Sequence, residues 1–457
     1  MKRTSTIYIC QNCGAETRQF FGRCPNCGSW NSIIEEKIKS SDVKNKIFKE
    51  SLEANKAEPI TSIKKNSIER IRSGYSELDR VLGGGLVPGS LVLIGGDPGI
   101  GKSTLLLQSA TEMAINESVL YITAEESREQ VHLRWQRLKK IESNLHLLAE
   151  TNVDLILAEL KSFNPSVAII DSIQALYDEN ISSTPGSVAQ VRECAASLQR
   201  LAKSKNIALL IVGHVTKEGM LAGPKVLEHL VDAVLTFEGD RFASHRLLRA
   251  VKNRFGATNE LGVFEMQGQG LVEVNNPSEI FLNSESANGV ATIVACEGTR
   301  PLAIDLQALT NQTTYASPRR TTTGIENNRL HQILAVIEKH MNLGLSRFDC
   351  YLAVAGGLEV EEPAADLGIA ASIISSYKNI KLPKRTVLIG EIGLGGQLRT
   401  VSQIQLRLKE AQRLGFNKAI IPKASGIESH KDDELAMTIE LASNLKEAMV
   451  IAMGDIF

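Results

Sequence analysis

The stretch that decides the fold is Gly96-Asp97-Pro98-Gly99-Ile100-Gly101-Lys102-Ser103, which Thr104 follows. It matches the pattern GxxxxGK[ST] in full, with an apolar run before it and an apolar helix candidate after it. The glycines let the backbone curl so that successive N–H groups point at phosphate oxygens, and the following helix adds the positive end of its dipole. We therefore expect ATP here, with Lys102 on the β- and γ-phosphates and Ser103 on Mg²⁺.

Short apolar runs alternate with amphipathic stretches on both sides of this loop, over residues 67–275. Near-continuous apolar runs suit strands that are buried on both faces of a sheet. The stretches 105–114 and 187–203 have a helical pattern. The expected strands are 91–95, 119–123, 167–171, 208–212 and 233–237. The alternation predicts an α/β fold in which helices cover a parallel sheet.

Three acidic residues end or follow strands of this predicted sheet. Asp171 ends the strand 167–171, where it could hold Mg²⁺ or its water (the Walker B role) or cap the next turn. Glu125 and Glu126 follow the strand 119–123, which we expect to lie next to the loop strand. We assign Glu125 as the residue that orients and deprotonates the attacking water. The alternative is a pair of surface carboxylates.

The N-terminus carries two CxxC pairs, Cys10 with Cys13 and Cys24 with Cys27. Four thiolates at this spacing suit tetrahedral Zn²⁺ and leave no open coordination position, so the metal would be structural. About thirty residues contain too little core to fold without it. A redox or iron–sulfur role is the alternative. This finger could contact DNA, contact a partner protein or organise an oligomer.

Bulk composition excludes several classes of protein. A net charge of −1 over 457 residues argues against a uniformly basic nucleic-acid binder. We find no run of about 18 apolar residues, and no apolar segment follows the basic N-terminus before Cys10, so we expect neither a membrane span nor a signal peptide. Seven cysteines, three of them isolated, indicate a reducing compartment, the cytoplasm.

Composition changes along the chain predict four zones. Residues 1–30 form the finger, residues 31–66 a lysine-rich linker, residues 67–275 the nucleotide domain and residues 276–457 a second α/β domain. The linker could instead be a basic segment that contacts DNA. The last zone is expected to hold a hairpin of 289–295 and 301–308, helices at 330–340 and 403–414, and strands at 386–389 and 419–421.

Taken together, these motifs resemble a known family. The phosphate loop, the glutamate after the next strand and the aspartate-ended strand are similar to a RecA-type ATPase core. The segment Gly74-Tyr-Ser-Glu-Leu-Asp-Arg-Val-Leu-Gly-Gly-Gly-Leu86 is similar to the entry of that core. Lys252-Asn-Arg-Phe-Gly256 resembles the signature pentapeptide of the bacterial RadA (Sms) family of DNA-repair proteins. That family implies a four-cysteine finger before the core and a Lon-protease-like domain after it, over almost the entire chain.

The resemblance also implies roles for residues outside the phosphate loop. Lys252 and Arg254 would act in trans on the γ-phosphate bound to a neighbouring subunit, or contact DNA, and the sequence does not separate the two. His214 would lie at the position of a γ-phosphate sensor, with a structural histidine as the alternative. The implied activity is that of a DNA-dependent ATPase and helicase-type motor, a homo-oligomer of hexameric form. It would act on single-stranded DNA and branched recombination intermediates beside a RecA-type recombinase. The rival is a nucleotide-switched scaffold that does not translocate on DNA.

The Lon-like domain departs from the protease pattern. Where Lon has its serine nucleophile after a proline, this chain has Ala364 after Pro363, and Gln405 stands where the lysine belongs. Alanine cannot attack a carbonyl and glutamine cannot act as its base, so we expect no protease activity. The domain could set ring geometry or face DNA. Its candidate basic residues for DNA are Arg300, Arg319, Arg320, Lys378, Lys381, Lys384 and Arg385. The stretch around Arg319 could also be a flexible loop.

Overall fold

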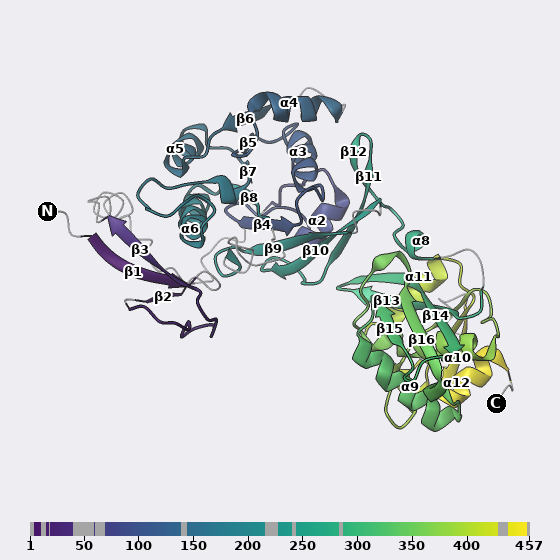
Figure 1. The fold of residues 1–457 in the computed structure, drawn as a ribbon. Helices are drawn as coiled ribbons and strands as arrows, with labels where there is room; N and C mark the ends of the chain where they lie inside the picture. Colours follow the sequence, from purple (N-terminus) through teal and green to yellow (C-terminus); the bar gives the residue numbers. More distant parts are fainter. Residues whose placement is uncertain are drawn as a thin grey trace. The chain divides into compact units, whose positions relative to one another are not determined.

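The computed structural model describes residues 4–10, 15–17, 19–39, 59, 69–138, 144–214, 227–239, 244–282, 287–427 and 437–454. The chain divides into two compact units, Met1–Glu273 and Val274–Phe457 (Figure 1). Within the described residues, none of the helices combines the length and apolarity that a membrane span requires.

The finger is a three-stranded antiparallel sheet in the order β2-β1-β3. Its strands are β1 (Thr4–Cys10), β2 (Glu16–Thr17) and β3 (Ile33–Lys39). β3 pairs with β1 along its whole length, from Ile33 opposite Cys10 to Lys39 opposite Thr4. The expected end of the finger at residue 30 is therefore wrong, because the first residues assigned to the linker provide backbone partners for β1. Of residues 40–66, only Pro59 lies within the described part of the chain.

The described part of the nucleotide domain holds a nine-stranded sheet in the order β12-β11-β10-β9-β4-β8-β7-β5-β6. The five expected strands are confirmed, and β6 joins them in the parallel part. Antiparallel strands β10 to β12 extend the sheet beyond β9. The strands are β4 (Leu91–Gly96), β5 (Val119–Thr123), β6 (Leu145–Ala149), β7 (Val167–Asp171), β8 (Ala208–Val212), β9 (Ala233–Glu238), β10 (His245–Asn253), β11 (Leu261–Gln267) and β12 (Gly270–Glu273).

One expectation about this sheet is wrong. β5 does not neighbour the loop strand β4, because β8 and β7 lie between them. The connection from β4 through the helix α3 (Lys102–Met113) crosses over two strand positions, and later segments of the chain fill them. Strand order is therefore set by pairing between segments far apart in the chain. That β5 is the next strand after β4 in the sequence does not predict that the two are neighbours in the sheet.

Helices cover both faces of this sheet (Figure 1). Side chains of α2 (Ser76–Leu82) and α3 share one apolar cluster with alternate residues of the strands. Those of α5 (Val153–Phe163) and α6 (Val188–Lys205) share a second cluster with the remaining strand residues. The chain also forms α4 (Arg128–Arg137) after β5 and a 3-10 turn, η1 (Ile173–Ala175), after β7. Because strand side chains alternate between faces, Tyr121 and Ile169 lie on the α3 face.

Within its described residues, the second unit contains a seven-stranded mixed sheet in the order β15-β16-β14-β13-β17-β20-β21. The expected hairpin is confirmed as β13 paired with β14. Arg320, next to the stretch for which a flexible loop was one alternative, begins β15, which pairs with β16. Its strands are β13 (Val290–Glu297), β14 (Arg300–Gln312), β15 (Arg320–Thr323), β16 (Phe348–Val354), β17 (Thr386–Leu388), β20 (Lys418–Pro422) and β21 (Thr438–Ala442), with a small hairpin of β18 (Glu391–Ile392) and β19 (Leu398–Arg399). Its helices are α8 (Ser278–Phe281), α9 (Asn327–Met341), α10 (Asp366–Lys378), α11 (Ile404–Arg413) and α12 (Leu445–Met453), and its 3-10 turns are η2 (Leu345–Arg347), η3 (Ala355–Gly357), η4 (Pro363–Ala365) and η5 (Lys423–Ser425).

Candidate functional site

The phosphate loop connects the end of β4 to the start of α3, and two of its glycines are required sterically. Gly96 has φ +148°, and a Cβ there would lie 2.6 Å from the carbonyl oxygen of Phe237 on the adjacent strand β9. Gly101 has φ +119° and precedes α3; a Cβ there would lie 2.9 Å from Cε of Met266. At Gly96 a Cβ would collide with the backbone oxygen of Phe237, and at both positions the positive φ disfavours a residue that carries a Cβ.

Lys102 is buried at the first position of α3 and turns back onto the loop. Its Nζ donates to the carbonyl oxygens of Gly96 at 2.7 Å and Asp97 at 2.9 Å. Burial lowers the pKa of Lys102, and the carboxylates of Asp171, Asp97 and Glu125 oppose that shift. The ammonium group is thus placed among loop carbonyls and acidic groups, where it can exchange these contacts for phosphate oxygens.

Asp171 lies at the end of β7 on the α3 face. One of its oxygens, Oδ2, accepts a hydrogen bond of 2.7 Å from the hydroxyl of Tyr121 on the neighbouring strand β5. Its charge acts on Lys102 at the start of α3, although β8 lies between β7 and the loop strand β4. Together, the Asp171 carboxylate and the Ser103 hydroxyl offer the oxygen ligands that Mg²⁺ prefers.

The two glutamates after β5 have different environments. Glu125 accepts a hydrogen bond from the Ser172 hydroxyl and another, of 3.1 Å, from Nε2 of His214. Glu126 instead pairs with Arg134 on α4. The hydrogen bond from His214 lowers the pKa of Glu125, whereas its partial burial acts in the opposite direction. Glu125 is therefore the ionised, partly exposed carboxylate beside Lys102, whereas Glu126 holds α4.

Lys252 and Arg254 lie near the start of β9, at the opposite end of the strands from the phosphate loop. Lys252 Nζ donates to the carbonyl oxygens of Glu228 and Val231, and Arg254 forms an ion pair of 3.0 Å with Asp232, which precedes β9. β9 is parallel to β4, with Ala233 opposite Val92 and Phe237 opposite Gly96, so the loop lies at the far end of β9. From Ala233 to Phe237 the strand spans about 13 Å. Neither basic side chain therefore contacts the phosphate loop of the same chain.

The pentapeptide is anchored by a turn far upstream in the chain. Arg70 donates to the carbonyl oxygen of Phe255 at 2.7 Å and to that of Leu82 at 3.3 Å. Gly83 and Gly256 touch through their backbones: a Cβ on either one would lie 2.9 Å from the Cα of the other. These contacts fix the end of the motif that carries Lys252 and Arg254.

Three of the four finger cysteines converge in the structure. The Sγ atoms of Cys10, Cys24 and Cys27 lie within 4.8 Å of one another, and those of Cys10 and Cys27 are 3.7 Å apart. Tetrahedral zinc with Zn–S bonds of about 2.3 Å requires S–S separations of about 3.8 Å, so the thiols fit Zn²⁺. Cys13, the expected fourth ligand, lies outside the described residues.

Ala364 and Gln405, which stand where Lon has its catalytic serine and lysine, do not form a dyad. Ala364 is buried in an apolar cluster with Leu408 of α11, whereas Gln405 is exposed on the same helix. Arg407 is the buried polar residue of α11, and sequence reasoning missed it. Its guanidinium donates to both carboxylate oxygens of Glu362 at 2.6 Å, next to Pro363. This ion pair ties α11 to the turn that carries Ala364.

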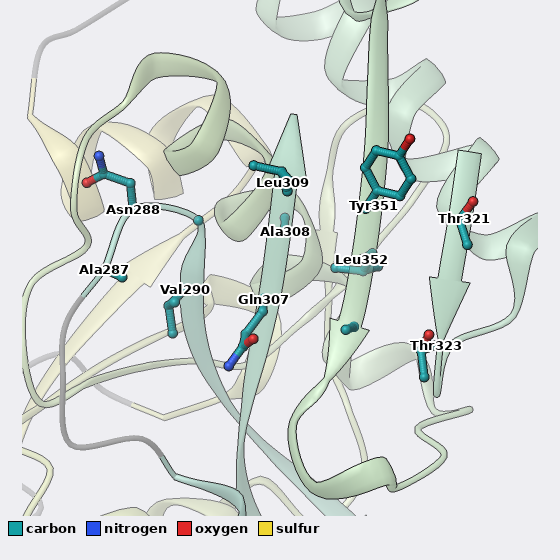
Figure 2. A pocket seen from close by; sticks show the side chains of 12 residues that line it. Ala287, Asn288, Val290, Gln307, Ala308, Leu309, Thr321, Thr323, Tyr351 and Leu352 are labelled. Atoms are coloured by element: carbon teal, nitrogen blue, oxygen red, sulfur yellow. The ribbon is translucent and has the colours of Figure 1, made fainter. Parts of the chain in front are cut away.

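The expected basic face of the second unit is only partly available. Arg300 is buried, with 8% of its surface exposed, so its inclusion among DNA-facing residues is wrong. Arg319 stacks over the ring of Tyr315, with 3.8 Å between Cζ and the ring centroid. Nearby, the sheet has a hollow lined by Gln307, Leu309, Thr321, Thr323 and Tyr351, among other residues (Figure 2). Its lining, as far as the structure describes it, includes neither a serine nor a lysine, so it does not hold the two groups of a Ser–Lys dyad.

Comparisons with known proteins agree with this layout. Three family models match: "AAA domain" over residues 57–220, "Rubredoxin metal binding domain" over 8–35 and "Subunit ChlI of Mg-chelatase" over 303–425. The DNA repair protein RadA of Synechocystis sp. is 54% identical, over 94% of this chain and 91% of that protein. The RadA of Bacillus subtilis is 50% identical, over 93% and 94% respectively. The RadA of Listeria monocytogenes is 49% identical, over 92% and 93%.

Fold and site define an ATPase with a RecA-like core, preceded by a zinc ribbon and followed by a Lon-like α/β domain. The matches extend over nearly the whole chain and over nearly the whole of each relative. The chain belongs to the RadA family of DNA repair proteins.

Proposed function

We propose that this protein is an ATP-driven motor that moves on single-stranded DNA as a ring of identical subunits. In the cytoplasm it would process or extend branched recombination intermediates beside a RecA-type recombinase. The observation that supports the proposal is that the phosphate loop and the basic pair Lys252 and Arg254 lie at opposite ends of the strands of one sheet. The phosphate loop follows the C-terminal end of β4, whereas Lys252 and Arg254 lie at the opposite end of the strands, where β10 ends. A complete site then requires a second subunit, as in a ring whose neighbours contact one another head to tail.

The proposed reaction uses the groups that the structure gathers around Lys102. Residues 96–104 would bind the phosphates through backbone N–H groups, Lys102 and the start of α3. Ser103 and Asp171 would hold Mg²⁺, which supplies positive charge to the β- and γ-phosphates. Glu125, which accepts a hydrogen bond from His214, would orient the attacking water and accept its proton.

The neighbouring subunit would complete the site. Its Lys252 and Arg254 would leave their own carbonyl and carboxylate partners and contact the γ-phosphate, as an arginine finger does. Such a group contributes about 10³–10⁵ in rate. Because this exchange moves the end of β10, hydrolysis in one subunit would change the conformation of the next. That coupling is what a motor requires and what a set of independent ATPases lacks.

DNA would be held chiefly by phosphate contacts and base stacking, so its binding should depend on salt and tolerate any base sequence. In the second unit, Arg319, Lys381 and Lys384 are exposed and available for such contacts.

The test is ATP turnover by zinc-loaded protein with and without single-stranded DNA, across a salt series. We expect stimulation that declines as salt rises, with Lys102→Ala as the inactive control. Strand displacement on forked DNA should then require ATP. Turnover that does not respond to DNA at any salt concentration would contradict the motor and support a nucleotide-switched scaffold.

A further inference from the structure

A buried tyrosine lies directly behind the proposed metal ligand. Tyr121 is in the middle of β5, and none of its surface is exposed. Its ring belongs to the apolar cluster on the α3 face, where phenylalanine would fill nearly the same space. The hydroxyl is therefore not needed for packing, and burying it is unfavourable unless it finds an acceptor.

Strand register brings that hydroxyl to the Asp171 carboxylate. β5 and β7 are parallel neighbours, and Tyr121 is paired with Ile169, two residues before Asp171 on the same face. Two residues of strand span about 6.6 Å, a distance that a tyrosine side chain covers along the sheet. The hydroxyl donates to Oδ2 of Asp171 at 2.7 Å, and none of the hydrogen bonds among the described residues goes to the other carboxylate oxygen, Oδ1.

The phenol is the donor of this pair, because the Asp171 oxygen accepts its hydrogen bond. A second group that orients a metal ligand commonly contributes 10–100-fold to metal affinity or activity, as an order of magnitude.

We propose that Tyr121 is a positioning residue for the Mg²⁺ site, whose hydroxyl holds Oδ2 of Asp171 so that Oδ1 is directed toward the metal–nucleotide complex. The inference rests on the assignment of Asp171 to Mg²⁺ under the proposed function, and it adds a residue that is not part of the phosphate loop or of either acidic position predicted from sequence.

The experiment compares Tyr121→Phe with Tyr75→Phe in the full-length protein. Tyr75 is a matched control, because it is a buried tyrosine of the same apolar cluster whose hydroxyl accepts a hydrogen bond of 3.0 Å from Gln108. Equilibrium binding of a fluorescent ADP is measured while Mg²⁺ is titrated, and once without Mg²⁺. ATP turnover is measured over the same Mg²⁺ range.

In Tyr121→Phe, the Mg²⁺ concentration for half-maximal enhancement of ADP binding should rise about tenfold. Binding without Mg²⁺ should match the wild type, which also shows that the variant is folded, and Tyr75→Phe should match it throughout. Unchanged Mg²⁺ dependence in Tyr121→Phe, with Asp171→Asn strongly impaired, would overturn the role of Tyr121 alone. Unchanged Mg²⁺ dependence in Asp171→Asn as well would overturn the metal assignment on which the inference rests.

Discussion

A mixture of two inactive variants, Lys102→Ala and Arg254→Ala, should hydrolyse ATP. The two residues lie at opposite ends of the strands, and about 13 Å of strand β9 separates these ends. Under the proposed mechanism, one ATP site would therefore combine Lys102 of one subunit with Arg254 of its neighbour. Each variant alone should lose about 10³-fold or more in turnover. In the mixture, an Arg254→Ala subunit has an intact loop, and a neighbouring Lys102→Ala subunit provides the intact arginine.

The expected magnitude follows from counting neighbours. With equal amounts and random assembly, a given loop is intact in about half of the subunits, and the adjacent arginine is intact in about half of their neighbours. About one quarter of the sites should therefore be complete, so about one quarter of the wild-type turnover is the upper value expected, since coupling between neighbours can only lower it.

The assay is steady-state ATP turnover with single-stranded DNA, after subunit exchange under conditions where light scattering shows one oligomer. Wild type mixed with the double variant is the matched control. Action in trans predicts about one quarter of wild-type turnover there, whereas action within one subunit predicts about one half. A mixture of the single variants no more active than their mean, together with one half in the control, would refute the reasoning.

Three further outcomes are expected. Lys102→Ala should lose ATP turnover yet unfold at nearly the wild-type temperature. Substantial residual turnover would contradict the assignment of residues 96–103 as the site that binds the ATP phosphates. His214→Ala should move the acid limb of the pH–activity profile to higher pH, because the hydrogen bond that lowers the pKa of Glu125 is lost; His214→Gln, which keeps an N–H donor, should restore it, and equal profiles would contradict the pairing. Cys24→Ser should release zinc, measured with a colorimetric chelator, and change the finger's circular dichroism while ADP binding persists. Retained zinc would exclude Cys24 as a ligand.

Local pattern was enough to predict the phosphate loop and every parallel strand of the described sheet except β6. Strands such as β4 and β7 are continuous apolar runs because they are buried on both faces, and glycine spacing reports the loop backbone directly. Strand order was not accessible, because the pairing of β4 with β8 and β9 joins segments more than a hundred residues apart. β3 was missed for the same reason: its partner, β1, lies on the other side of the cysteine cluster.

The candidate site shows the same division between local and non-local information. Glu125 and Glu126 are adjacent in sequence and chemically equal, and only their partners, His214 and Arg134, give them different environments. Tyr121 appears in the sequence as one more apolar strand residue, and strand register is what brings it to Asp171. Arg407 was missed because a charged residue on a helix is ordinarily solvated.

Gly83 and Gly256 have a consequence for how this sequence can vary. Each occupies the space that a Cβ on the other would need, and neither can be replaced by anything smaller. A substitution at one position therefore has no compensating substitution at the other, and the backbone itself must separate. We therefore expect that neither position tolerates a residue other than glycine. The Gly83→Ala/Gly256→Ala double variant should be no more stable than the less stable of the two single variants.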